Sequence, residues 1–514
     1  MQAGSLCYFH PILRMSVNFT MLIGYDIGSS SIKAALVNSA SGATVAVVYS
    51  PETEMDILAA KPGWAEQDPE VWWENICLAT RKLLAQTGVN PADIKAIGIS
   101  YQMHGLVTVD KFGEASRPAI IWCDSRAVEI GEAAFDRIGH EKCAAHHLNS
   151  PGNFTASKLK WIKNNEPGIY NKIDKIMLPG DYIAMRLTGE ICTTVSGLSE
   201  GILWDFKAKK IAHLVLDNYE IDAALIPAIA PTLSIQGKVT NKAAEATGLH
   251  AGIPVTYRAG DQPNNALSLN VLQPGEVGAT GGTSGVVYGI VDTLVYDKQM
   301  RVNSFAHVNH RADAPRIGVL LCINGAGILY RWMRQQVGTS DHTFSEMSRI
   351  ADEVVIGAEG LRILPFGNGA ERMLGNQNIG AHIHNLQLNT HTRAHLYRAA
   401  LEGIGFSFVY GMSILQEMGL NMNAIRVGND NLFQSKAFGK TIATLTDSQI
   451  QVVETTGAVG AAKAAGVAVG VYHSLEEAMQ NIKVILTYFP DREKEKYEGA
   501  YEDWYNVTRT FLSI

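Results

Sequence analysis

The stretch LIGYDIGSSSIKAA, residues 22–35, decides the fold. Residues 21–25 are apolar and rich in β-forming side chains, which predicts a buried strand. Residues 26–31 (DIGSSS) are turn formers, and residues 32–37 and 44–49 predict two more strands. Because the connections are short and polar, the three strands are expected to form a β-meander.

A long helix is predicted to follow this meander. Asp68 can cap its N-terminus, Pro69 suits the first helical position, and Gly88 suits the end. Between them the apolar residues recur at the spacing of one helical face: Trp72, Ile76, Ala79 and Leu83. Residues 94–101 then predict another strand. Strands and helices therefore alternate, which is typical of an α/β protein with a layered sheet.

A second copy of the opening pattern lies about half the chain away, in GEVGATGGTSGVVY at residues 275–288. The two copies align at the pairs Gly28/Gly282, Ser29/Thr283 and Ser30/Ser284. Each is a strand, a turn of small residues and a strand, so we infer two similar domains that face each other. We expect an N-terminal domain over residues 21–270, a C-terminal domain over 271–514, and a loose extension, from an upstream start codon, over 1–20.

The composition is that of a globular protein, with 46% hydrophobic and 18% charged residues among 514. Lys and Arg number 43 against 50 Asp and Glu, and the net charge of −7 argues against a nucleic-acid partner. No run of 18 apolar residues is present, so we predict no transmembrane helix and no membrane partner. Six cysteines without CxxC spacing favour reduced thiols in a cytoplasmic protein.

Both small-residue turns expose backbone N–H groups, which makes each of them suitable for binding an anion. Two such turns on opposed domains could grip a polyphosphate from both sides, although each alone is also compatible with an ordinary hairpin. Asp26 ends its strand just before the first turn, where a carboxylate could hold Mg²⁺ through water. An aspartate that merely initiates the turn is the alternative.

A further carboxylate, Asp261, lies in GDQPNN at residues 260–265. Residues 253–257 before it predict a strand and residues 266–269 after it predict a helix. Chemistry in α/β proteins is commonly located at such strand-to-helix junctions. Asp261 could accept the proton of an attacking hydroxyl, or it could simply cap the following helix.

Polar groups also follow two other strands. Gln102 and His104, in QMHG, offer an amide and an imidazole to a polyol, while a lone histidine more often has a structural role. Asp124 and Arg126 follow a short apolar strand and could form a local ion pair. The small-residue run at 460–470 predicts a tightly packed helix that lets another element, or a flat ligand such as a purine, approach closely.

Taken together, these segments resemble the FGGY family of carbohydrate kinases, in the actin/hexokinase/Hsp70-like ATPase superfamily. The resemblance covers residues 21 to about 505. Its carriers are GYDIGSSSIK (24–33), QMHG (102–105), PAIIWCDSR (118–126), GDQ (260–262), GTSG (282–285) and TGAVGAA (456–462). Within the family, QMHG is typical of xylulokinases, whereas glycerol kinases carry Arg-Glu-Thr there.

The resemblance implies two ribonuclease-H-like domains with ATP and a sugar in the cleft between them. Asp261 would be the base that takes the proton of the 5-hydroxyl of D-xylulose, and Asp26 would organise Mg²⁺. The implied sugar-side residues are Gln102, Met103, His104, Asp124, Arg126 and Gln262. The implied nucleotide-side residues are Gly28, Ser29, Ser30, Lys33, Gly282, Thr283, Ser284, Gly428 and Asn429.

The chain departs from the family pattern at two places. Residues 427–430 read VGND where Gly-Gly-Gly-Ala is usual, which bears on how a purine sits, and GDQ replaces the Asp-Asn common in xylulokinases. The alternatives are therefore the same chemistry on gluconate or ribulose, or a non-enzymatic nucleotide switch of the actin type. Dimers are common in the family, so a homodimer is expected from the resemblance alone.

Overall fold

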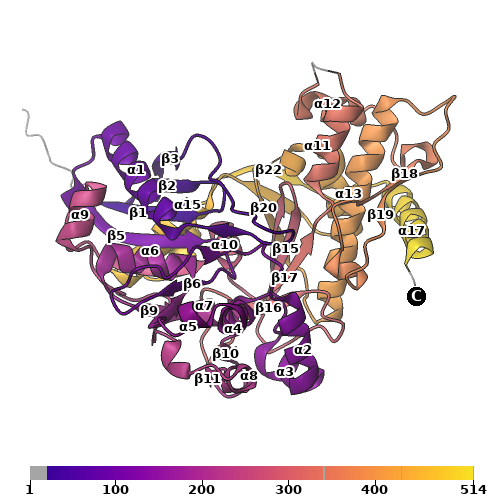
Figure 1. Ribbon diagram of the computed structural model, residues 1–514. Helices are drawn as coiled ribbons and strands as arrows, with labels where there is room; N and C mark the ends of the chain where they lie inside the picture. The colour runs from indigo at the N-terminus through magenta and orange to yellow at the C-terminus, as the bar shows by residue number, and fades with distance from the viewer. Residues whose placement is uncertain (1–19, 340–341, 430, 513–514) are drawn as a thin grey trace, which may run out of the picture.

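The computed structural model describes residues 20–339, 342–429 and 431–512 (Figure 1). Of the predicted extension at 1–20, all but Thr20 lies outside the described residues, as does Asp430 of the VGND segment. The fold is mixed α/β and contains two large sheets, as predicted. Within the described ranges no helix is both long and apolar enough to span a bilayer.

The first sheet has five strands in the order β13-β5-β1-β2-β3. Its members are β1 (Met21–Ile27), β2 (Ile32–Asn38), β3 (Thr44–Ser50), β5 (Ile94–Tyr101) and β13 (Val255–Gly260). The meander β1-β2-β3 is antiparallel, as predicted, while β5 and β13 run parallel to β1. The carboxyl ends of β1, β5 and β13 therefore meet at one edge of the sheet.

Helix α1 (Pro69–Thr87) confirms its prediction in detail. The Asp68 side chain accepts a hydrogen bond from the backbone N–H of Glu70, and Gly88 ends the helix at a φ of 65°. The predicted apolar face is fully buried at Trp72, Ile76, Ala79 and Leu83.

The second sheet has seven strands in the order β16-β17-β15-β14-β20-β21-β22. Its members are β14 (Glu276–Gly281), β15 (Gly285–Val291), β16 (Asn303–Ala306), β17 (Ile317–Ile323), β20 (Ala424–Gly428), β21 (Ile450–Val453) and β22 (Val484–Tyr488). The β14–β15 hairpin is the predicted counterpart of β1–β2. The helices that accompany this sheet include α11 (Gly327–Gln336), α12 (Phe344–Ala351), α13 (Arg393–Glu417), α14 (Lys436–Leu445) and α17 (Lys494–Phe511).

Helix α15 (Gly457–Ala468) confirms the predicted small-residue helix and lies on the first sheet, although it comes from the far end of the chain (Figure 1). A Cβ atom on Gly24 of β1 would lie 1.9 Å from the carbonyl oxygen of Ala458, and one on Gly98 of β5 would lie 2.0 Å from that of Ala461. The small residues therefore serve backbone-to-backbone packing, which was one of the two alternatives considered.

A largely helical region between β6 (Val107–Val109) and β12 (Ala228–Ala230) was not predicted from the sequence patterns. It contains α2 (Val128–Ile138), α3 (His140–His147), α4 (Thr155–Asn165), α6 (Pro179–Thr188), α7 (Val195–Glu200) and α8 (His213–Tyr219). In Figure 1, most of this region lies below the first sheet.

Two predicted boundaries near Asp261 were wrong. The strand expected at 253–257 is Val255–Gly260, and the helix expected from 266 begins at Asp261 as α10 (Asp261–Ser268). Pro263 falls in the first turn of that helix, where its missing N–H breaks no helical hydrogen bond. Asp261 is thus the first helical residue, and Gly260, rather than Asp261, is the N-cap.

Candidate active site

Three polar segments meet where parallel strands of the first sheet end. Strand register places Ile27 and Gly260 on either side of Tyr101. Asp26, the QMHG segment and Asp261 therefore lie at neighbouring strand ends, the position at which open α/β sheets bind ligands. A Cβ on Gly260 would lie 2.6 Å from Cγ of Met103. Residue 260 must therefore lack a side chain for Asp261 to lie beside QMHG.

The carboxyl group of Asp261 has a raised proton affinity. Burial raises its pKa to about 7, and the negative charge of Asp26 adds to that rise. Hydrogen bonds to Gln262 and the charge of Lys33 act in the opposite direction. A base with a pKa near the working pH combines a sizeable deprotonated fraction with a real affinity for the proton. The alternative, in which Asp261 is the N-cap of the following helix, does not apply because the N-cap is Gly260.

Asp26 is held from three sides. The Ser100 hydroxyl donates to its Oδ1 at 2.9 Å, and the Lys33 ammonium lies 3.7 Å from its Oδ2. On the third side the N-terminus of α15 approaches so closely that a Cβ on Gly457 would lie 2.9 Å from Oδ2. Asp26 is therefore fixed in the site, which goes beyond the role of a turn former.

Two neighbouring carboxylates that repel each other suit a divalent cation. Mg²⁺ prefers oxygen ligands and keeps several waters, so Asp26 and Asp261 fit it chemically. Among the described residues, no group of three or more His, Cys, Asp or Glu side chains could hold a metal ion. A cation at Asp26 would thus take most of its ligands from water and from a phosphorylated substrate.

His104 presents a hydrogen-bond acceptor. It lies in the left-handed region with a φ of 61°, and its Nδ1 is 2.9 Å from the backbone carbonyl oxygen of Glu200. A carbonyl only accepts, so Nδ1 carries the proton. Burial lowers the pKa of the ring to about 3, which leaves it neutral with a bare Nε2. The rings of Phe154 and Phe305 lie against it, with centroids 4.7 and 5.3 Å away.

Two other carboxyl or amide groups lie at this edge. Gln102 is buried, and its Nε2 donates to Gln67 at 3.3 Å while its Oε1 has no protein partner among the described residues. Glu200, at the end of α7, is also buried, and burial together with the charges of Asp261 and Asp181 raises its pKa well above the usual range. Glu200 therefore adds a buried carboxyl group beneath the site that the sequence patterns did not indicate.

Asp124 and Arg126 form the local ion pair considered as an alternative. Nε and Nη2 of Arg126 donate to Asp124 at 2.9 and 2.6 Å, and the backbone N–H of Ala65 donates to the same carboxylate at 2.6 Å. Both side chains are buried, and the guanidinium lies 3.8 Å from the centroid of Trp64. Their role in contacting a sugar stays a prediction.

The two predicted phosphate turns differ in their surroundings. In the first, the Gly28 N–H donates to Ser31 within the hairpin at 3.1 Å, while Ser29 and Ser30 remain partly or fully exposed. In the second, Gly282 and Thr283 accept hydrogen bonds from the N-terminal residues Gly327 and Ile328 of α11, at 3.2 and 2.9 Å. The second turn is thus joined to a helix N-terminus, which favours anions.

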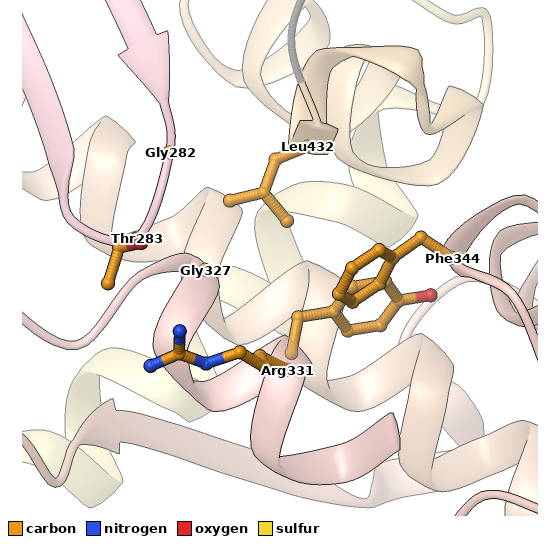
Figure 2. Close-up of a pocket in the computed structure, with 7 residues that line it drawn as sticks. Gly282, Thr283, Gly327, Arg331, Phe344 and Leu432 are labelled. Atoms are coloured by element: carbon orange, nitrogen blue, oxygen red, sulfur yellow. The ribbon is translucent and has the colours of Figure 1, made fainter. Parts of the chain in front are cut away.

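A pocket of about 200 Å³ adjoins the second turn (Figure 2). Figure 2 shows Thr283 and the Arg331 guanidinium towards one side and the rings towards the other. The rings of Tyr330 and Phe344 are stacked, with centroids 5.9 Å apart. The full lining is Gly282, Thr283, Gly327, Tyr330, Arg331, Phe344 and Leu432. The two aromatic rings form a flat apolar wall opposite the Arg331 guanidinium and the turn predicted to bind phosphate. This arrangement suits a nucleotide.

Most of this pocket was not foreseen from the sequence. Apart from Gly282 and Thr283, its residues come from α11, α12 and η5 (Asn431–Gln434), and no local spacing marks them. The predicted Gly428 and Asn429 lie at the end of β20, next to η5, without lining the pocket. A further residue missed is Glu371, whose carboxylate accepts the N–H groups of Asn324 and Gly325 at 3.0 and 2.9 Å, just ahead of α11.

Comparisons with known proteins agree with this architecture. Residues 21–268 match the model of the FGGY carbohydrate kinase N-terminal domain, and residues 277–469 match that of the C-terminal domain. The chain is 30% identical to a xylulose kinase of Staphylococcus xylosus, covering 83% of this chain and 88% of that protein. It is 28% identical to one of Escherichia coli K12, covering 92% and 95%.

Among solved structures, the xylulose kinase of Rhodospirillum rubrum superposes with a TM-score of 0.85 at 26% identity, covering 95% of this chain and 98% of that one. The two-domain mixed α/β fold is therefore that of the actin/hexokinase-like ATPases. The chain belongs to the FGGY family of carbohydrate kinases and is a phosphotransferase.

Proposed function

We propose that this protein phosphorylates D-xylulose at its 5-hydroxyl with ATP, giving D-xylulose 5-phosphate and ADP. The observation that carries the proposal is the position of Asp261, with a pKa near 7, beside the QMHG segment at the shared edge of β1, β5 and β13. The names of the related kinases support the choice of sugar.

In the proposed reaction, the deprotonated Asp261 carboxylate accepts the proton of the 5-hydroxyl. The sugar oxygen forms a bond to the γ-phosphorus as the bond from that phosphorus to the β,γ-bridging oxygen breaks, and ADP leaves. Phosphoryl transfer depends chiefly on positioning and on stabilising charge. Mg²⁺, which Asp26 would hold mainly through water, supplies neutralisation of the phosphate charge.

The sugar and the nucleotide would occupy different ends of the site. On the sugar side, the bare Nε2 of His104 accepts a hydroxyl hydrogen bond and Met103 packs against the carbon chain. On the nucleotide side, Gly282 and Thr283 receive phosphate, Arg331 balances its charge, and the Tyr330–Phe344 wall lies against the base. The described cysteines are all free, which fits a reducing compartment such as the cytoplasm.

The test is coupled ADP release with ATP and Mg²⁺ against D-xylulose, ribulose, gluconate and no sugar. Turnover that depends on D-xylulose is expected. Turnover with gluconate alone would overturn the substrate, and slow hydrolysis that no sugar stimulates would favour the actin-like alternative. The Asp261→Asn variant should retain ATP binding and lose sugar-dependent turnover, so undiminished turnover would refute the assigned base.

A further inference from the structure

A lysine lies fully buried beneath the sugar end of the site. Lys158, in α4, has no exposed surface, and its ammonium donates to the backbone carbonyl oxygens of His104 at 2.8 Å and Ile121 at 3.0 Å. Within the described residues, no carboxylate oxygen comes within 4.0 Å of it. Burying a cation without a direct counter-ion is costly, so the two carbonyl contacts must be valuable to the fold or to the function.

The two carbonyls belong to the two segments expected to line the sugar site. His104 is the residue of QMHG that adopts the strained left-handed conformation. Ile121 follows β7 (Ala119–Ile120) and opens the segment that leads to Asp124 and Arg126. The first residue of the same helix helps, because the Thr155 hydroxyl donates to the carbonyl of Gly105 at 3.3 Å. One turn of α4 thus fixes two consecutive carbonyls of QMHG.

We propose that Lys158 is a positioning residue for the sugar: it ties His104 to Ile121 and so holds the imidazole in the orientation that presents Nε2 to the substrate. The inference rests on the proposed function. Lys158 itself does not touch the sugar, since it lies behind the backbone that it binds. Its loss should therefore loosen sugar binding while leaving the nucleotide end unchanged.

The tie does not require the positive charge. Burial lowers the pKa of Lys158 to about 7, with the charge of Arg126 adding to that effect and those of Asp124 and Glu200 opposing it. A neutral amine still has two N–H groups, one for each carbonyl. A test must consequently remove the N–H donors of Lys158, and removing its charge alone is not sufficient.

The central variant is Lys158→Met, which keeps the length and apolar character of the side chain and removes every donor. The matched control is Lys160→Met on the same helix, where the ammonium pairs with the exposed Glu220 at 3.6 Å and with no other carboxylate of the described residues. We expect Lys158→Met to raise the KM for the sugar at least tenfold, with the dissociation constant for ADP within twofold of the wild type. Lys160→Met should change neither value.

Two milder variants keep the inference testable if Lys158→Met does not fold. Lys158→Gln can still donate to one carbonyl and should raise the KM for the sugar by less than Lys158→Met would, and Thr155→Val should raise it about threefold. An unchanged KM for the sugar in the folded variants, or an equal loss of ADP affinity, would overturn the positioning role. Failure of the wild type to phosphorylate any sugar is a separate result that would overturn the proposed function and this inference with it.

Discussion

The hairpins β1–β2 and β14–β15 share a sequence pattern but differ in the chemistry around their turns. The first carries Asp26 and Lys33, within 3.7 Å of each other, whereas the aligned positions of the second are Thr280 and Val287. The first hairpin therefore carries a charged pair, which suits the proposed acid–base and cation chemistry. The second hairpin has no charged side chain at these two positions, and the cation near its turn, Arg331, comes from α11.

Each turn nevertheless lies against the N-terminus of a helix from elsewhere in the chain. Gly457 of α15 faces Asp26, and Gly327 of α11 faces Gly282. A helix N-terminus carries a partial positive charge, which is useful wherever phosphate or carboxylate must be held. The comparison teaches that a repeated scaffold can keep a hairpin packed against a helix N-terminus while the side chains of the two hairpins differ.

The largest expected effect is that of Asp261→Asn, which removes the proposed base beside the first hairpin and leaves the second hairpin untouched. We expect kcat to fall by about 10³-fold, within the range for loss of a general base. ATP affinity, measured by equilibrium binding, should be unchanged because the second hairpin is untouched. A loss of ATP affinity as large as the loss of kcat would show that the two hairpins are not functionally separate.

The next effect is on pH dependence, through Asp26→Asn. Asp261 must be deprotonated to accept a proton, so wild-type kcat/KM should fall as the pH drops through about 7. Removing the charge of Asp26 lowers the pKa of Asp261, and the acidic limb of the profile should move to lower pH. Its maximum should also fall by about 10²-fold if Asp26 organises Mg²⁺. An acidic limb that stays in place would contradict the coupling between the two carboxyl groups.

A third, paired prediction concerns the two helix N-termini. Gly327→Ala would place a Cβ 2.1 Å from the carbonyl oxygen of Gly282, and overpacking of about 1–3 kcal/mol should raise the KM for ATP about tenfold or more. Gly457→Ala should instead lower kcat, because its Cβ meets Asp26. The control is Gly499→Ala in α17, where a Cβ would meet no atom within 4 Å. If Gly327→Ala and Gly457→Ala change the same kinetic constant, the two helix N-termini do not have the separate roles proposed for them.

The smallest effect is expected from the turn hydroxyls. Thr283→Val and Ser29→Ala each remove one donor, and a hydrogen bond worth about 0.5–1.5 kcal/mol corresponds to a rise of about two- to tenfold in the KM for ATP. Steady-state kinetics at saturating sugar measures both. An unchanged KM in both variants would mean that backbone N–H groups alone bind the phosphates.

The sequence was sufficient to predict features that depend on neighbouring residues. It was not sufficient to predict features that depend on contacts between distant segments. The strands of the meander and the caps of α1 were predictable because Asp68, Pro69 and Gly88 act on their immediate neighbours. Asp26 and Asp261 could be placed near strand ends from apolar runs, although β1 extends to Ile27 and β13 to Gly260, beyond the ends predicted. That both lie at one edge of the sheet required the pairing of β5 with β1 and β13, which no local pattern specifies.

The rest depends on contacts between distant segments. Tyr330, Arg331 and Phe344 become a pocket only when α11 and α12 pack beside the second turn. In the sequence, Lys158 resembles a solvent-exposed helix residue. Its sequence neighbours do not indicate that its ammonium will donate to the carbonyls of His104 and Ile121. The assigned roles of the candidate site residues stay predictions for the experiments above to test.

The crossing of α15 onto the first sheet also bears on how the chain is made. During synthesis, β1, β2 and β5 leave the ribosome more than 350 residues before the helix that covers them, Gly457–Ala468. Until then the Gly24 and Gly98 face of the sheet lacks its partner, and such surfaces are prone to aggregation in nascent chains. A nascent chain that has not yet reached Gly457 therefore exposes this face of the first sheet, and synthesis of α15 is required before the sheet can be covered.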